Sequence, residues 1–165
     1  MRRSIKVDLY TDSFDQFCHL IGEQDAHILE LACDPGTITR YLLSQRPDFQ
    51  ILGIDLAPKM IALAEQNNHN AHFIVMDAED ILSIGQTFDG IRCGICLPSL
   101  SREKALKLIV DRSKLLEEGG ILTFSMMEDA YEKSGMQREG SCGFLPENAQ
   151  KIDNCLEIIL SKFLL

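Results

Sequence analysis

The feature that most constrains the fold is an apolar run that ends in a short acidic turn and passes at once into a helical segment. Residues 27–32 supply the run, and Asp34-Pro35-Gly36 follows it. Proline after aspartate is typical of a helix start, so we expect a helix from residue 34 or 35 to about residue 44. This arrangement suits a buried strand whose carboxyl end opens onto a ligand.

The pairing of an apolar run with a helical segment recurs along the chain. Further strands are expected over 50–55, 72–77, 88–97 and 121–126, and further helices over 59–66, 78–84 and 102–116. Strands that alternate with helices through short connections form βαβ units and a parallel sheet. The sequence therefore predicts an α/β fold with a doubly wound, mostly parallel sheet and helices on both faces.

The length of 165 residues corresponds to a single domain. An N-terminal cap helix is expected because Phe14, Phe17, Leu20 and Ile21 are spaced like one helical face. The predicted organisation is a cap helix in 1–25, a core of alternating strands and helices in 27–127, and a loop followed by a terminal helix over 152–165 in the segment 128–165.

Charge and composition exclude several classes of function. A net charge of −9 argues against nucleic acid and against anionic membranes as partners. The N-terminus has no apolar signal region and no run of about 18 apolar residues occurs, so we expect a cytoplasmic protein with reduced thiols. Cys93 and Cys96 match a CxxC pattern, but no second pair stands at zinc spacing and no metal is predicted.

Acidic residues stand at the carboxyl ends of the first three predicted strands. Asp34 and Gly36 follow the first strand, Asp55 ends the second and Asp77 ends the third. Each aspartate alone fits an ordinary helix N-cap. Three in succession favour a nucleoside site, because an acidic residue after the second strand can accept hydrogen bonds from ribose hydroxyls.

The turn residues restrict which nucleoside is bound. A dinucleotide fold requires several glycines, whereas residues 32–37 contain only Gly36. Asp34 would also repel a phosphate, and no phosphate-binding loop motif is present. A nicotinamide-dependent oxidoreductase is therefore disfavoured and rests on the shared topology alone.

Several segments together resemble class I S-adenosylmethionine-dependent methyltransferases. Residues 30–39 are similar to the family pattern E-L-[GA]-C-G-x-G-x-[IL]-[ST], and residues 53–60 to G-x-D-x-S-x-x-M. Residues 73–80, and 88–90 with 115–122, continue the resemblance, which covers about residues 27–127. The resemblance implies a Rossmann-like fold, the cofactor S-adenosyl-L-methionine and the product S-adenosyl-L-homocysteine.

The resemblance also implies a role for each matching residue. The turn would lie under the methionine part of the cofactor, Asp55 would accept from both ribose hydroxyls, and Asp77 would accept from the adenine amine. Leu56 and Met60 would pack on adenine, Ala78 would donate its N–H to the ring, and Cys93 would lie near the reacting methyl. The implied cofactor-binding residues are Glu30, Ala32, Cys33, Asp34, Gly36, Asp55, Leu56, Met60, Asp77, Ala78 and Cys93.

Methyl transfer from a sulfonium needs mainly an ordered, in-line nucleophile. No catalytic residue is assigned, because a dedicated base is needed only for a protonated nucleophile. The four histidines are expected to be surface or structural residues: His19, His27, His69 and His72. Leu97-Pro98-Ser99 differs from the [DN]-P-P-[YFW] of nucleic-acid amino-methyltransferases, so a small-molecule acceptor is favoured.

Two departures from the family pattern leave alternatives open. Asp34 replaces a glycine, and it is either the helix N-cap, a partner for the ammonium of the cofactor, or a cause of weak binding. The chain also ends where an antiparallel hairpin is usual, so either the hairpin is missing or residues 128–165 form something reduced. An uncovered fifth strand would favour self-association. These departures support an alternative function, a catalytically degenerate domain that acts as a binding or interaction module.

Overall fold

The computed structural model describes residues 11–93, 110–127, 149–152 and 155–161. Its centre is a seven-stranded sheet with the strand order β3-β2-β1-β4-β5-β7-β6. Expectations for Cys96, for the first part of the helix predicted over 102–116 and for the loop before residue 149 lie outside the described residues.

The elements follow the predicted alternation through the first four strands. The strands are β1 (His27–Leu31), β2 (Gln50–Asp55), β3 (His72–Val75), β4 (Phe88–Cys93), β5 (Leu116–Met127), β6 (Ala149–Ile152) and β7 (Cys155–Ser161). The helices are α1 (Thr11–Leu20), α2 (Thr37–Gln45), α3 (Pro58–Asn67) and the 3₁₀ helix η2 (Ala78–Ile84), and residues 110–113 are also helical.

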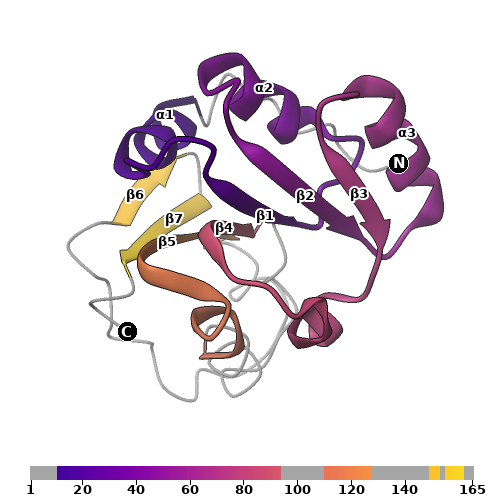
Figure 1. The fold of residues 1–165 in the computed structure, drawn as a ribbon. Helices are drawn as coiled ribbons and strands as arrows, with labels where there is room; N and C mark the ends of the chain where they lie inside the picture. Colours follow the sequence, from indigo (N-terminus) through magenta and orange to yellow (C-terminus); the bar gives the residue numbers. More distant parts are fainter. Residues whose placement is uncertain (1–10, 94–109, 128–148, 153–154, 162–165) are drawn as a thin grey trace, which may run out of the picture.

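Strands β1 to β5 form a parallel sheet (Figure 1). From β1 the chain moves outward to β2 and β3, and it then crosses back to place β4 and β5 on the other side of β1. Ligands bind outside the carboxyl ends of the strands where the strand order reverses in this way. In this protein that point lies between β1 and β4, as the α/β prediction requires.

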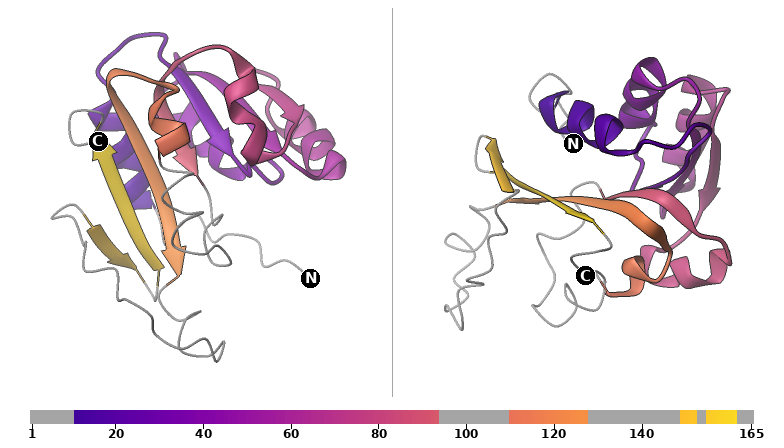
Figure 2. Two further views of the ribbon diagram at one scale, coloured as in Figure 1. Left: turned by 90° about the horizontal axis from the view of Figure 1, so that it is seen from below. Right: turned by 60° about the vertical axis from the view of Figure 1, so that its left-hand side comes forward.

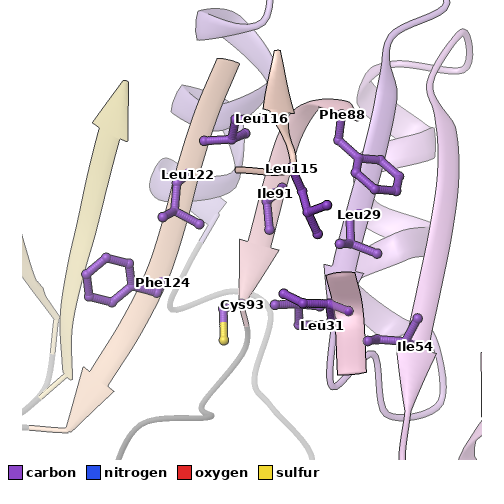
Figure 3. Close-up of a cluster of buried hydrophobic side chains, with 11 residues drawn as sticks. Leu29, Leu31, Ile54, Phe88, Ile91, Cys93, Leu115, Leu116, Leu122 and Phe124 are labelled. Carbon is purple, nitrogen blue, oxygen red and sulfur yellow. The ribbon is translucent and has the colours of Figure 1, made fainter. Parts of the chain in front are cut away.

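Helices cover both faces of the sheet (Figure 2). Alternate residues of β1 separate the two layers, because successive side chains of a strand point to opposite faces. Ile28 packs with Phe14, Phe17 and Leu42 under α1 and α2. Leu29 and Leu31 belong to the opposite layer, whose residues are drawn in Figure 3: Leu29, Leu31, Ile54, Ile81, Phe88, Ile91, Cys93, Leu115, Leu116, Leu122 and Phe124. The doubly wound prediction is confirmed.

The alternative in which the carboxyl-terminal hairpin is missing is wrong. Strands β6 and β7 pair antiparallel, and β7 pairs antiparallel with β5. The predicted terminal helix over 152–165 is also wrong, because residues 155–161 form β7. A short apolar run fits a helix or a strand equally well, and pairing with β5 decides for the strand. Because β7 covers β5, the reason for expecting self-association through that strand is removed.

Element boundaries differ from the prediction at further places. Strand β3 ends at Val75 rather than at residue 77, so Asp77 lies two residues beyond the strand. Helix α2 begins at Thr37 rather than at residue 34 or 35. Helical structure ends at residue 113, and β5 begins at Leu116 instead of Ile121. The early start of β5 comes with an irregularity in its pairing with β4, between Phe88 and Gly90. Among the described residues, no helix has the length and apolar character needed to cross a membrane.

Candidate cofactor site

The turn after β1 alternates into the left-handed backbone region three times. Ala32, Asp34 and Gly36 have φ angles of +53°, +48° and +73°. Aspartate tolerates this region better than most residues, and glycine adopts it without steric cost. The N-cap of α2 is Gly36. The interpretation of Asp34 as a helix N-cap is therefore wrong, because the left-handed residues bend the chain before the helix begins.

Asp55 joins the turn to the start of α3. Its Oδ2 accepts a hydrogen bond from the Asp34 N–H at 3.1 Å, and its Oδ1 accepts one from the Ala57 N–H at 2.8 Å. The Asp55 side chain sits at the end of β2 in a residue that is only 6% exposed. An ionised carboxylate has about four acceptor positions. Two positions are used by these backbone donors, so two remain for hydroxyl groups of a ligand.

Two asparagines at the end of α3 hold the turn from behind. Asn67 Nδ2 donates to the Pro35 carbonyl at 2.9 Å, and buried Asn68 Nδ2 donates to the Gly36 carbonyl at 3.0 Å. A Cβ at Gly36 would collide with the Asn68 side chain and crowd Ala64. Sequence reasoning did not assign Asn67 or Asn68 to the site. No local signal marks them, because the turn carbonyls that they bind lie 32 residues earlier in the chain.

Beneath the turn, polar side chains form a buried row across the sheet. Glu30 is opposite Arg92 in the β1–β4 register, and Arg92 is opposite Thr123 on β5. All three residues are at most 1% exposed. The Arg92 guanidinium also lies 4.1 Å from the ring centroid of Phe14. Ionisable groups at this depth require such neighbours, because burial alone disfavours their charged forms.

The carboxyl group of Glu30 is strongly perturbed. Burial raises its pKa to about 7, while a hydrogen bond from Thr39 and the charge of Arg92 oppose the rise. The Thr39 hydroxyl donates to Oε2. Oε1 is buried and has no hydrogen-bond partner among the described residues. Glu30 therefore links β1 to the first turn of α2 and keeps one buried acceptor position below the turn.

The other predicted cofactor residues lie at the same edge of the sheet in different environments. Leu56 is 67% exposed, and Met60 on α3 is half-buried. Asp77 is exposed and accepts from the Glu79 N–H at 2.9 Å, so it is the N-cap of η2, which begins at Ala78. The structure brings Cys33, Asp34 and Asp55 into direct proximity. The cofactor roles assigned to all of these residues stay predictions.

Cys93 ends β4 as expected, with its side chain in the apolar layer. It is 1% exposed, and Figure 3 shows its sulfur between the side chains of Leu31 and Phe124. Its predicted place near a reacting methyl also stays a prediction. The histidines are all exposed: His19, His27, His69 and His72. Among the residues that the structure describes, no three metal-binding side chains gather in one place.

A hollow of about 1070 Å³ lies at the opposite edge of the sheet. It is lined by the ends of α1 and α2 and by the residues that precede β1 and β2, among them His19, Gln24, Arg46 and Asp48. This hollow is open and faces the amino ends of the strands. We place the candidate site at the acidic turn instead, because a parallel sheet presents ligands at the carboxyl ends of its strands.

Comparisons with known proteins agree with this geometry. A family model described as a methyltransferase domain matches residues 28–120. A malonyl-[acyl-carrier protein] O-methyltransferase of Paenibacillus sp. (strain JDR-2) is 35% identical over 105 residues, which are 59% of this chain and 37% of that protein. The chain thus spans little more than a third of the length of this curated relative.

Solved structures show the same fold. An S-adenosylmethionine-dependent methyltransferase from Clostridium acetobutylicum superposes with a TM-score of 0.64 at 23% identity, over 76% of this chain and 52% of that chain. The plantazolicin methyltransferase BamL, crystallised with a triazolic desmethylPZN analogue and SAH, gives a TM-score of 0.62 at 20% identity, over 74% of this chain and 48% of that chain. The Rossmann-like methyltransferase fold predicted from the motifs is confirmed.

Proposed function

The chain belongs to the class I S-adenosylmethionine-dependent methyltransferase family, and from this premise we propose that it binds S-adenosyl-L-methionine at the acidic turn and transfers the methyl group to a small molecule. The observation that carries the proposal is the bonding of Asp55. Its carboxylate is fixed by two backbone N–H groups from different segments and keeps acceptor positions at the carboxyl end of β2, next to β1.

The residues of the site fit the cofactor. Asp55 accepts hydrogen bonds from the ribose hydroxyls, and exposed Leu56 covers the adenine. Asp77 accepts a hydrogen bond from the adenine amine while it also caps η2. The turn of residues 32–36 lies under the methionine part, and Glu30 beneath it retains a buried acceptor. S-adenosylmethionine, when bound, supplies an activated methyl group on its sulfonium. The protein contributes position and exclusion of water, which account for most of the rate enhancement expected here.

The acceptor is proposed to be a small molecule. The net charge of −9 disfavours nucleic acid, whose binding needs a basic surface. Relatives and structural neighbours include an O-methyltransferase named for a carrier-protein-bound malonyl group and a methyltransferase crystallised with a plantazolicin analogue. These names support acceptors presented as small organic groups.

Binding is tested by thermal unfolding with S-adenosylmethionine or S-adenosylhomocysteine. A ligand that binds only the folded state must raise the melting temperature, so we expect a clear shift at millimolar ligand. In Asp55→Ala the shift should disappear. The matched control is Asp48→Ala, because Asp48 also bonds within the fold but lies at the amino end of β2. It should keep the shift even if it lowers the melting temperature itself.

Two results would contradict the proposal. The absence of any shift in the wild-type protein at millimolar ligand would remove the cofactor site. An undiminished shift in Asp55→Ala would move the site away from the acidic turn. Turnover is then measured as methyl transfer to a panel of small acids, phenols and amines. Binding without turnover on any acceptor would favour the degenerate binding module instead.

A further inference from the structure

Carboxylates are concentrated around the turn of residues 32–36. The thiol of Cys33 lies within this turn, and its pKa is raised by burial and also by the charges of Glu30, Asp55 and Asp34. Three carboxylates thus act on the Cys33 thiol in the same direction. Asp55 is buried, which reduces the screening of its charge by water.

Asp34 contributes to this negative charge from a fixed position. Its backbone N–H is bound to Asp55 at 3.1 Å, and its φ of +48° is set by the turn. A side chain with a single methylene keeps its carboxylate close to the backbone, so the charge of Asp34 stays near that of Asp55. The residue is half-buried. The motif that residues 30–39 resemble has a neutral glycine at this position, so the charge of Asp34 is a departure from that motif.

The cofactor and the product of methyl transfer differ in charge. S-adenosylmethionine carries a sulfonium, an ammonium and a carboxylate, and its net charge at neutral pH is positive. In S-adenosylhomocysteine the sulfur is a neutral thioether, and the net charge is zero. A negative site therefore attracts the cofactor more than it attracts the product.

Resting on the proposed function, we propose that Asp34 is a specificity-determining residue that favours the cationic cofactor over its neutral product. The Asp34 carboxylate makes the turn bind a ligand with a positive sulfur more tightly than one with a neutral sulfur, in addition to recognising the shape of the nucleoside. The consequence for turnover is weak product inhibition, because the neutral product leaves a site that holds the cation more tightly.

The test measures the dissociation constants of S-adenosylmethionine, S-adenosylhomocysteine and sinefungin by calorimetry. Sinefungin carries an amine on the carbon that replaces the sulfonium, so it is a cation that transfers no methyl group. In Asp34→Asn we expect the preference for both cations over S-adenosylhomocysteine to fall by about fivefold. Added salt should reduce the wild-type preference in the same direction. Asparagine adopts the left-handed region readily, so the turn is retained.

The matched control is Glu65→Gln, which removes one negative charge from the exposed face of α3. Its preference should stay within about twofold of the wild type, since solvent screens the charge of an exposed side chain. Asp34→Gly serves as a second uncharged variant that suits the positive φ. If both Asp34 variants bind the ligands with the wild-type preference, the inference is overturned while the proposed function stands. If the wild type binds none of the ligands, the proposed function fails and this inference fails with it.

Discussion

The two ends of strands β1 and β2 are held by opposite chemistry. At the carboxyl end, the Asp55 carboxylate collects backbone N–H groups from the turn and from the start of α3. At the amino end, the Arg46 guanidinium collects backbone carbonyls. Nη1 donates to Cys18 at 3.1 Å and to Ile21 at 2.7 Å, and Nη2 donates to Glu23 at 2.7 Å.

The two ends differ in what remains available. The other two N–H groups of Arg46 donate to the Asp48 carboxylate, at 2.9 and 2.8 Å, so all five of its donors are used. Asp55 uses two of about four acceptor positions. The amino end is therefore a closed structural clamp, and the carboxyl end is a clamp that can also hold a ligand. The side chain whose hydrogen-bonding positions are all used is structural, and the side chain that keeps free positions can bind a ligand.

Removal of the Arg46 side chain should have the largest effect on stability and none on the cofactor. In Arg46→Ala three backbone carbonyls and Asp48 lose a charged donor, and we expect the free energy of unfolding to fall by about 4 kcal/mol. Urea unfolding measures this loss. The dissociation constant of S-adenosylhomocysteine should stay within about twofold of the wild type, provided that the variant is measured where it is folded.

The control for Arg46 is Arg40→Ala, at an exposed arginine on α2, the helix that Arg46 follows. Its effect on the free energy of unfolding should be within about 0.5 kcal/mol. If Arg46→Ala weakens ligand binding as strongly as it lowers stability, the two ends are not separate, and the distinction between scaffold and site is lost.

A second experiment sharpens the comparison through Glu30, the buried carboxyl group below the ligand end. Its pKa is raised from 4.5 to about 7 by burial, so the folded state holds the proton more tightly than the unfolded state. The stability that comes with this proton is present in full below pH 4.5 and is lost as the pH rises to about 7. The loss is at most about 3 kcal/mol.

Glu30→Gln removes this titration. The free energy of unfolding of the variant minus that of the wild type should increase by up to about 3 kcal/mol from pH 4.5 to 8, measured by urea unfolding at several pH values. Glu65→Gln, on an exposed face, should show a flat difference. A flat difference for Glu30→Gln as well would mean that the carboxyl group titrates normally in the fold.

Much of the ligand end could be predicted from the sequence because its parts are local. Residues 50–55 form β2 with the predicted bounds, since a strand covered on both faces is a continuous apolar run bounded by turn residues. Asp55 was found for the same reason, because it ends that run. The acidic turn was recognised from its residues, although its left-handed conformation was not.

The features that could not be predicted from the sequence depend on partners that are distant along the chain. Asn68 bonds to Gly36, which lies 32 residues before it, and no local pattern marks that contact. Arg46 follows the last residue of α2, and its three carbonyl partners lie in residues 18–23. Strand β7 was predicted to be a helix because its apolar spacing fits either structure. Its pairing with β5, a partner distant along the chain, decides for the strand.

The smallest expected effect on stability comes from substitutions of glycine. Three glycines separate the cost of a positive φ from the cost of steric overlap. Gly36 combines a φ of +73° with a Cβ position that would overlap Asn68. Gly85 has a φ of +70°, and a Cβ there would make only an ordinary contact with the Ser83 carbonyl oxygen at 3.9 Å, whereas Gly22 has neither restriction. Alanine should therefore cost about 2 kcal/mol of unfolding free energy at Gly36, about 1 kcal/mol at Gly85 and almost nothing at Gly22.

The same series decides whether the turn is specialised for a ligand. Gly36 is the N-cap of α2, and displacement of this helix end also displaces the turn that Asp55 holds. Gly36→Ala should therefore reduce the free energy of S-adenosylhomocysteine binding by more than it reduces the free energy of unfolding. Gly85→Ala should lower the melting temperature and leave the dissociation constant unchanged. Equal binding by the two variants would show that the turn tolerates displacement, and the ligand end would then be as purely structural as the end held by Arg46.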